Sequence, residues 1–298
     1  MASLERYLRL TDLAQRAFQR ARLERALTLF SAAEREAGVM ADRELQDRAF
    51  CNRCVVLLEL ERLDGAVGEL KHVLMRSRDP FTSWMAAYYT AQVYEVEENI
   101  PRALFYARRA SELANACGER RARKGSVNQL GVMALRDSHF GEAADNFRVA
   151  LELAAEDGED PVNLAVARDN LGYCLMCTGS VSEGLDLCSD AAATLEALGS
   201  RHLLPEVYQD LCYGELQQSR IAEARAFGER ALALAHEFSH PTVERNTLML
   251  LADATLDAGD EEAADAYLGR LASHYPDFAG MKAFMHAFNV REVINLKA

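Results

Sequence analysis

The sequence predicts an all-α protein, built as an array of about seven antiparallel helical hairpins with a C-terminal capping helix. Three observations carry this prediction. Small residues recur at a nearly constant interval along the chain. Apolar residues between them are spaced by three and four, as on one face of a helix. Proline and polar turn residues fall between the apolar segments. Such hairpins bury one face only when neighbouring hairpins cover it, so the repeats are expected to stack.

Composition limits the function classes before any motif is considered. Half of the 298 residues are hydrophobic and 27% are charged, which is typical of a globular protein. The net charge of −13 argues against nucleic acid as a general partner. No run of 18 apolar residues occurs, so no membrane span is expected. The first residues lack a signal-peptide pattern, and seven cysteines without framework spacing indicate reduced thiols, so we expect a cytoplasmic protein.

The clearest hairpin lies in residues 124–163. Its first helix carries Leu130-Gly131, and a polar break follows at 137–139. The second helix then carries Phe140, Ala143 and Phe147 at helical spacing. Because Gly131 and Ala143 lack bulk, the two helices are expected to approach closely where they cross. A large residue at either position should overpack one layer.

The pattern recurs along the whole chain. The small position of the first helix is filled, at intervals of 37 to 41 residues, by Ala14, Cys54, Ala91, Gly131, Gly172, Cys212 and Ala252. The small position of the second helix is filled by Ala26, Ala66, Ala103, Ala143, Gly184, Ala224 and Ala264. We therefore predict one repeat array over 1–276, with units starting near residues 7, 47, 84, 124, 165, 205 and 245.

Helix boundaries are marked by local chemistry. Asp79-Pro80, Asp160-Pro161 and His240-Pro241 each place a proline eleven residues before the small position. Proline is tolerated at the first helical position and aspartate is a good N-cap, so these dipeptides predict helix starts. Within the hairpins, polar or glycine-containing turns are expected at 64–65, 98–99, 178–180 and 259–260.

Residues 277–298 follow Tyr275-Pro276 and form the C-terminal tail. They carry an apolar stripe at helical spacing, which consists of Phe278, Met281, Phe284, Met285 and Phe288. The leading interpretation is a helix that caps the exposed end of the stack. Two alternatives stay open: a homodimer contact through this helix, or a tail docked in the groove of its own array.

Two motifs resemble metal sites but fit the repeat better. His236-Glu-Phe-Ser-His240 matches H-E-x-x-H, the basis for a remote zinc-hydrolase alternative. Pro241 follows at once, however, and His240 stands where other units have an N-cap residue. The pairs Cys51/Cys54 and Cys174/Cys177 lie three repeats apart, too far to share one ion. No phosphate loop or nucleophile motif occurs, so we expect no enzymatic activity, no cofactor and no metal.

One basic cluster stands out in this acidic chain, and it consists of Arg120, Arg121, Arg123 and Lys124. We interpret it as a solvated linker near a helix C-terminus, where cations are favourable. The alternative is a patch that binds an acidic or phosphorylated partner segment.

The spacing L-G-x-x-A followed by F-x-x-A-x-x-x-F-x-x-A in 130–150 resembles the tetratricopeptide repeat (TPR), although the usual tryptophan is Val127 here. The period of about 40 residues is similar to that of extended TPR arrays. The resemblance implies a right-handed superhelical solenoid whose first helices line a concave groove. The positions that it places on this groove are Arg48, Asn52, Tyr88, Tyr89, Gln92, Asn128, Gln129, Val132, Asp169, Asn170, Tyr173, Gln209, Asp210 and Tyr213.

This groove is rich in amides and tyrosines. Amides both donate and accept hydrogen bonds, which suits a peptide backbone, and tyrosines offer large contact areas. The groove carries no lysine, so it departs from TPR domains that clamp a chaperone's C-terminal carboxylate. The leading hypothesis is a cytoplasmic protein-interaction adaptor or scaffold that binds a peptide segment of another protein. The alternative is a bacterial regulatory sensor whose superhelix responds to a peptide or small ligand.

Overall fold

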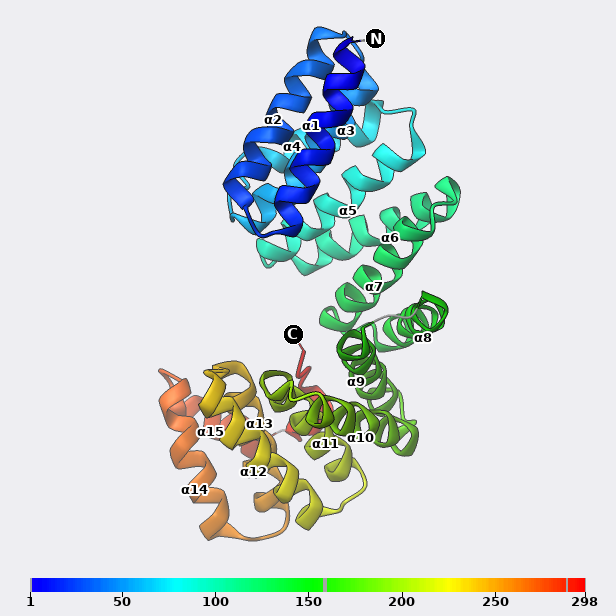
Figure 1. Cartoon of the computed structure of the whole chain (residues 1–298). Coiled ribbons are helices and arrows are strands. Elements are labelled where there is room, and N and C mark those ends of the chain that lie inside the picture. The colour runs from blue at the N-terminus through cyan, green and yellow to red at the C-terminus, as the bar shows by residue number, and fades with distance from the viewer. Residues whose placement is uncertain (1, 158–159, 288, 298) are drawn as a thin grey trace. The chain divides into compact units, whose positions relative to one another are not determined.

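The computed structural model describes residues 2–157, 160–287 and 289–297 (Figure 1). All regular structure within these residues is helical, which confirms the predicted all-α class. The chain divides into two compact units, 1–133 and 134–298, and each is described by itself. Their division does not test the prediction of one array over 1–276 with a separate tail, which stays a prediction.

The first unit is made of helices that pack in chain order. α1 lies against α2, α2 against α3, and α5 against α6, while the shorter α4 packs chiefly against α5. The helices are α1 (Ala2–Gln19), α2 (Leu23–Val39), α3 (Arg43–Glu59), α4 (Ala66–Arg76), α5 (Pro80–Val96), α6 (Ile100–Cys117) and most of α7 (Arg120–Arg136).

The second unit begins in the last turn of α7. Here α9 lies against α10, α11 against α12, and α13 against α14, so antiparallel hairpins are again the building block. The helices are α8 (Phe140–Asp157), α9 (Pro161–Cys177), α10 (Val181–Ala197), α11 (Leu204–Gln217), α12 (Ile221–Phe238), α13 (Pro241–Asp257), α14 (Glu261–Leu271), α15 (Phe278–Ala287) and α16 (Val290–Val293).

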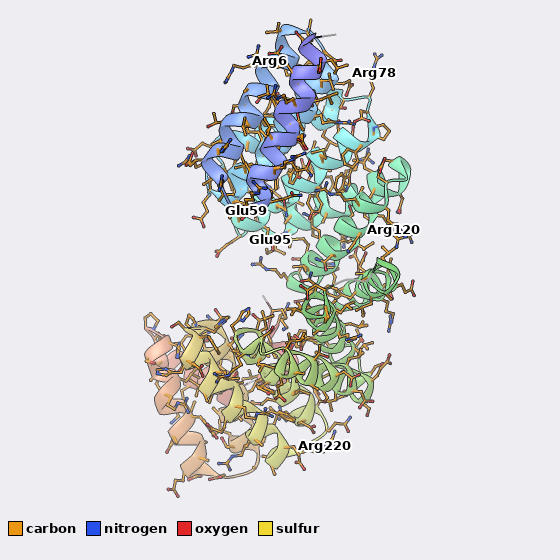
Figure 2. All side chains as sticks on the ribbon, viewed as in Figure 1. Arg6, Glu59, Arg78, Glu95, Arg120 and Arg220 are labelled. Atoms are coloured by element: carbon orange, nitrogen blue, oxygen red, sulfur yellow. The ribbon has the colours of Figure 1, made fainter. Side chains whose placement is uncertain are left out.

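The small positions do what their size predicts. Every residue in both recurring sets is buried. The closest crossing is that of α9 and α10, where a Cβ added to Gly184 would lie 2.4 Å from the carbonyl oxygen of Gly172. That distance is shorter than any real Cβ contact, so this crossing requires glycine. Charged side chains such as Arg6, Glu59 and Arg220 are exposed (Figure 2).

Caps and turns also follow the local chemistry. The carboxylates of Asp79 and Asp160 accept hydrogen bonds from backbone N–H groups in the first turns of α5 and α9, and Pro80 and Pro161 occupy the first helical position. His240 stands at the equivalent cap position of α13 without a side-chain cap bond. Most turns between helices contain one residue with positive φ, which lets the chain reverse within a few residues.

The expectation for the basic cluster at 120–124 was wrong in one respect. Gly118 adopts a left-handed conformation with φ of 70° and ends α6, so α7 already begins at Arg120. The cations therefore lie in the first turns of a helix rather than in a linker near a helix C-terminus. The macrodipole disfavours cations at this end, so it does not explain their presence.

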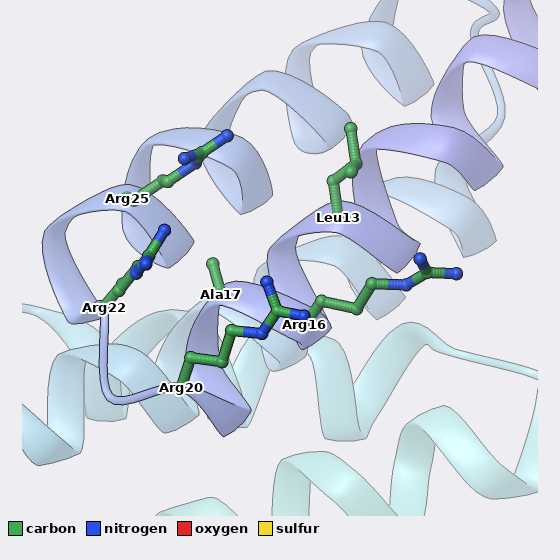
Figure 3. A pocket seen from close by; sticks show the side chains of 6 residues that line it. All are labelled: Leu13, Arg16, Ala17, Arg20, Arg22 and Arg25. Carbon is green, nitrogen blue, oxygen red and sulfur yellow. The ribbon is translucent and has the colours of Figure 1, made fainter.

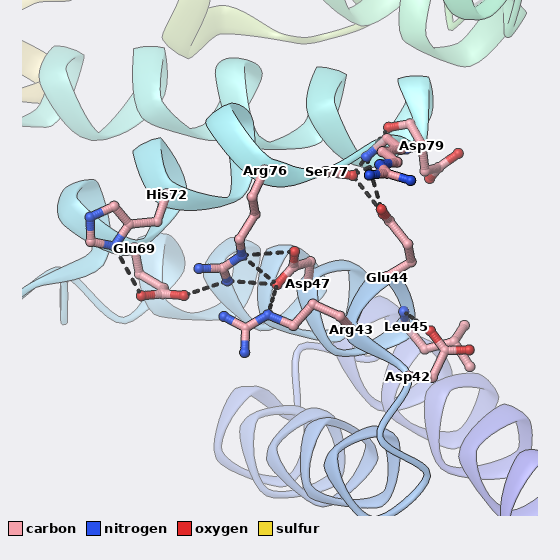
Figure 4. A network of polar contacts seen from close by, with 11 residues as sticks. Asp42, Arg43, Glu44, Leu45, Asp47, Glu69, His72, Arg76, Ser77 and Asp79 are labelled. Atoms are coloured by element: carbon pink, nitrogen blue, oxygen red, sulfur yellow. Dashed lines mark hydrogen bonds and ion pairs between the residues drawn. The ribbon is translucent and has the colours of Figure 1, made fainter.

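A polar network fixes α3 against α4 in the first unit. The carboxylate of Asp47 is 2% exposed and accepts three hydrogen bonds from Arg76, at 2.6, 3.0 and 3.3 Å (Figure 4). Arg76 also reaches Glu69 at 2.7 Å, and Arg43 lies 3.6 Å from Asp47 on the other side. The buried carboxylate is thus neutralised by residues of its own hairpin.

Candidate functional site

The C-terminal tail of the second unit lies across the first helices of successive hairpins. Residues 289–297 form hydrogen bonds or ion pairs with α9, α11 and α13, and the red end of the chain lies beside these helices in Figure 1. We call the surface that holds them the tail-binding face. It consists of Asp169 and Tyr173 from α9, Glu206, Asp210 and Tyr213 from α11, and Asn246, Asp253 and Asp257 from α13.

Lys297 occupies the centre of this face. Its Nζ lies 2.8 Å from Asp210 Oδ2, 3.2 Å from Asp169 Oδ2 and 3.5 Å from Glu206 Oε2. Its side chain is only 9% exposed, and it also lies 5.9 Å from the centre of the Tyr173 ring. An ammonium group is thus held by three carboxylates from two helices.

The electrostatics of this pocket depend on both partners. Burial alone would lower the pKa of Lys297, but the charges of Asp169, Asp210 and Glu206 outweigh it, and the pKa is raised well above its ordinary value. Burial raises the pKa of the Asp210 carboxyl, and the Lys297 charge opposes that rise. The ionised form of Asp210 therefore depends on the cation beside it.

A second cation anchors the start of the tail. Arg291 Nε lies 2.9 Å from Asp253 Oδ2, and its guanidinium also contacts Asp257. The Arg291 side chain is 14% exposed and that of Asp253 is 5% exposed. The backbone N–H of Val290 donates to the other oxygen of Asp253 at 3.3 Å. Two basic side chains six positions apart thus occupy separate acidic sites.

The peptide backbone of the tail is also recognised. The N–H of Leu296 donates to the Tyr173 hydroxyl at 2.9 Å, and the Asn246 amide donates to the Leu296 carbonyl at 3.3 Å. The Tyr213 hydroxyl donates to the carbonyl of Arg291 at 3.4 Å. These contacts do not depend on the side chains of the tail, so another segment with a similar backbone path could make them as well.

An amide of the tail completes the set. Asn295 Nδ2 donates to the carbonyl of Leu135 at 2.8 Å and lies 3.0 Å from the Ser138 hydroxyl. Leu135 belongs to the last turn of α7, where helix carbonyls lack partners within the helix. The Leu135 carbonyl also accepts from the backbone N–H of Ser138 at 3.1 Å, so the side-chain amide of Asn295 is a second donor to it.

The repeat register explains why the face is so regular. Tyr173, Tyr213 and Asp253 each follow the small position of their helix by one residue, so successive hairpins present them in line. The rings of Tyr173 and Tyr213 lie 5.5 Å apart, and Phe140 lies 6.0 Å from Tyr173. Because the neighbouring small residues are buried in the crossing, the residue beside each of them is directed to the face.

Several predicted groove residues lie in this second unit. Asp169, Tyr173, Asp210 and Tyr213 contact the tail, whereas Gln209 is buried at 1% exposure and Asn170 is half-buried. Sequence reasoning missed Glu206, Asn246, Asp253, Asp257 and all the tail residues that contact the face. Glu206 and Asn246 both stand six residues before a small position, so the repeat register could have found them.

The other predicted groove residues belong to the first unit and form a different environment. Tyr88 and Tyr89 lie 5.5 Å apart beside Trp84, and Gln129 donates to the Tyr88 carbonyl at 2.9 Å. Burial raises the pKa of both tyrosines. The remaining members differ in exposure, since Asn128 is exposed while Arg48, Asn52, Gln92 and Val132 are half-buried.

Arg48 in this set has a structural partner. It forms an ion pair with Asp79 and lies over the Phe81 ring at 5.5 Å. Asp79 is also the N-cap of α5, so the contact ties α3 to the start of that helix. Much of what the sequence placed in a groove of the first unit is thus committed to packing.

A second basic cluster was missed. Arg16, Arg20, Arg22 and Arg25 surround a small pocket of about 160 Å³ at the turn between α1 and α2, together with Leu13 and Ala17 (Figure 3). All four arginines are exposed, and Arg16 pairs with Asp12 on the same helix. The R-x-x-x-R-x-R-x-x-R spacing in 16–25 was the available signal.

The sequence motifs that resemble metal sites lie at the positions that the repeat register predicts. His236 lies in the last turn of α12 and His240 stands at the N-cap position of α13, with a left-handed Ser239 between them. Burial raises the pKa of Cys54 and Cys174 to about 12, so these thiols stay protonated. Within the described residues, no group of three or more His, Cys, Asp or Glu side chains could hold a metal ion.

Comparison with solved structures identifies the fold. NprR in complex with its cognate peptide NprX matches with a TM-score of 0.68 at 12% identity, covering 95% of this chain and 83% of that one. The apo form of the quorum sensor NprR from B. thuringiensis gives 0.66 at 13% identity, covering 98% and 81%. A Rap protein complexed with competence and sporulation factor gives 0.66 at 11% identity, covering 93% and 78%.

No protein-family model and no curated protein matches this sequence. Across the described part of the chain, no helix is long and apolar enough to cross a membrane. Identities of 11 to 13% establish the fold and nothing more specific. The helical hairpins, the buried small positions and these structural matches together show that the chain has a TPR-like helical-repeat fold.

Proposed function

We propose that this chain is a non-enzymatic protein-interaction adaptor that binds a peptide segment of a partner on the tail-binding face. The observation that carries the proposal is the tail itself, because residues 289–297, which comprise the short helix α16 and the non-helical residues on either side of it, occupy this face through both backbone and side-chain contacts. Solved structures of the same fold support it, since NprR is seen with the peptide NprX and a Rap protein with competence and sporulation factor.

The chemistry of the face favours a peptide over a small metabolite. Its hydrogen-bonding groups are spread over the first helices of three hairpins instead of converging on one cavity. Tyrosine hydroxyls and an asparagine amide face the backbone of the bound segment, and carboxylates face its basic side chains. This combination matches main-chain recognition with a preference for cations.

The proposal is tested with a positional-scanning library of fluorescein-labelled decapeptides. Binding is measured by fluorescence anisotropy on the full chain and on the full chain carrying Arg291→Glu and Lys297→Glu, which empties the face. We expect saturable binding below about 100 µM to at least one of these chains. The Tyr213→Ala and Asn246→Ala double variant should lose it, whereas Asn146→Ala on α8 should not.

If neither chain binds any library peptide, the proposal is overturned. Binding that survives the Tyr213→Ala and Asn246→Ala changes would place the peptide elsewhere and would equally overturn the assigned face. Circular dichroism at 222 nm on every variant separates loss of binding from loss of helices.

A sensor role is the second candidate, and one observation favours it. The tail contacts four of the helices that build the second unit, from α7 to α13, so a ligand on this face would release contacts spread over the unit. Small-angle scattering with and without a bound library peptide tests this role. An unchanged profile would favour the adaptor.

The homodimer through the C-terminal helix stays a prediction. In α15, Met285 is buried and Lys282 lies 3.6 Å from Asp265 of α14, so part of this helix packs against its own chain as a cap would. Phe284 is exposed, and Phe288 of the predicted stripe lies outside the described residues. Sedimentation of the Phe284→Asp variant, compared with the wild type, tests the dimer.

A further inference from the structure

We propose that the tail-binding face selects a segment with two basic side chains six positions apart, and that residues 289–297 are a built-in competitor for it. The inference rests on the proposed function and adds to it the chemistry of the partner and the way its access is controlled. The tail supplies the pattern directly, with Arg291 in one acidic site and Lys297 in the other.

The charge balance of the face favours a basic segment. Asp169, Glu206, Asp210, Asp253 and Asp257 contribute five carboxylates to the two sites, and the tail brings two cations. A surplus of negative charge remains when the tail is bound. The face is therefore complementary to a segment at least as basic as the tail, and an acidic segment would be repelled.

The two most buried carboxylates of the face share one cation. The side chain of Asp169 is 5% exposed and that of Asp210 is 0% exposed, and the ammonium of Lys297 pairs with both. One oxygen of each, Oδ1, is buried and makes no hydrogen bond with a described group. Two carboxylates at this depth are costly unless a cation joins them, so the pair is built to receive an ammonium.

Some contacts of the tail-binding face could be made by any bound segment, and others select for particular side chains of that segment. Contacts to the carbonyl of Arg291 and to both backbone groups of Leu296 do not depend on the side chains of the bound segment. Selection comes from the two acidic sites and from the α7 end, where the Asn295 amide donates to the Leu135 carbonyl. The preferred partner segment thus carries a lysine, an asparagine two residues before it, and a second cation six residues before it.

The tail and a partner compete because both would place a basic side chain at the site that Lys297 occupies. A partner and the tail cannot both occupy Asp210, because Lys297 already lies 2.8 Å from it. The apparent affinity for a partner then equals the intrinsic affinity multiplied by the fraction of chains whose tail is released. Weakening the tail should strengthen partner binding without any new contact.

The experiment uses a fluorescein-labelled peptide of sequence NVREVINLK, copied from 289–297, and its anisotropy on the full chain. On the Lys297→Glu chain the probe should bind at least about tenfold more tightly than on the wild type. Lys282→Glu makes the same charge change in α15, outside the face, and should leave the affinity at the wild-type value. A probe whose final lysine is replaced by methionine should lose at least about tenfold on the Lys297→Glu chain.

Equal probe affinity for the wild type and the Lys297→Glu chain would overturn the competition. Equal affinity of the lysine and methionine probes would overturn the basic selectivity. If Lys297→Glu alters the circular dichroism, Lys297→Met serves as the releasing variant. The proposed function survives these failures if library peptides still bind in a manner that needs Tyr213 and Asn246, and both proposals fall if nothing binds.

Discussion

Each unit of this chain buries a carboxylate between helices, and the two units neutralise it in different ways. In the first unit, Asp47 is paired with Arg76, 29 residues away on the next helix. In the second unit, Asp169 is paired with Lys297, 128 residues away in the tail. Arg76 belongs to α4, which packs in the same unit as Asp47, whereas Lys297 belongs to the tail after the last hairpin.

A buried charge therefore does not by itself reveal its role. Asp47 and Asp210 are similarly buried, at 2% and 0% exposure. What distinguishes them is whether the counter-charge belongs to the same hairpin or arrives from outside it. On this distinction rests our proposal that the acidic residues facing Lys297 bind a partner, whereas Asp47 and Arg76 form a structural pair.

The largest expected effect on stability comes from removing the ion pair between Asp47 and Arg76. Arg76→Met leaves Asp47 buried with only the exposed Arg43 at 3.6 Å, so the free energy of unfolding should fall by about 3 kcal/mol. Arg43→Met is the matched control, because Arg43 is 61% exposed and should cost less than about 1 kcal/mol. Urea unfolding followed by Trp84 fluorescence reports on this unit. Equal losses in both variants would contradict the assigned pair.

The next effect tests the helix crossing beneath the tail-binding face. Gly184→Ala places a Cβ 2.4 Å from the Gly172 carbonyl oxygen, which should cost about 1–3 kcal/mol and shift α9. Gly141→Ala meets nothing within 4 Å and should instead stabilise by roughly 0.5–1 kcal/mol. Thermal unfolding by circular dichroism compares the two. An unchanged Tm for Gly184→Ala would mean that the crossing is looser than this distance indicates.

A smaller, pH-dependent effect is expected at the tail. Lys297→Met should cost about 1–2 kcal/mol near pH 8, less than Arg76→Met, because a released tail lets water reach the carboxylates. The loss should shrink as the pH falls toward the raised pKa of Asp210, because a protonated carboxyl needs no cation. In the wild type the pKa of Lys297 is raised, so its charge persists over this range.

The measurement is the Tm difference between wild type and Lys297→Met in steps from about pH 8 to pH 5, with Lys282→Met as the control. A difference that grows as the pH falls would contradict the expected direction. A difference that stays constant would mean that Asp210 does not titrate in this range.

The smallest effect concerns one hydrogen bond of the tail. Asn295→Ala removes one donor to the Leu135 carbonyl, which should weaken tail docking by about 1 kcal/mol. The amide of Leu296, which donates to Tyr173, should then exchange with deuterium about fivefold faster. Asn146→Ala, on α8, should leave that exchange rate unchanged.

Much of the fold could be predicted because its signals are local. The residues at the small positions and the Asp-Pro helix starts act within one hairpin, and all of the small residues are buried as expected. The start of α7 could not be placed as well, since Gly118 ends α6 earlier than the charge pattern indicated. A left-handed glycine shifts a boundary without changing hydrophobic periodicity.

The sequence predicted part of the candidate site, the tail-binding face, and the reason lies in the repeat register. Asp169, Tyr173, Asp210 and Tyr213 were found because they lie within three residues of a small position, on the predicted inner side of their helix. Gln129 satisfied the same rule, and Arg48 was placed in the same groove, yet both are used for packing in the first unit. The register says which way a side chain is directed, and it does not say what will lie against it.

By itself, the sequence determined the helical class, the repeat period, the buried small positions and the residues directed to one face of each hairpin. These follow from interactions within about 40 residues, which periodicity records. Only the tertiary structure decided that Lys297 and Arg291 lie on that face, and that its acids are compensated by the tail. Such contacts leave no periodic trace, whether they span 128 residues as between Lys297 and Asp169 or 34 as between Arg291 and Asp257, because an ion pair depends on where two segments meet and not on their spacing in the chain.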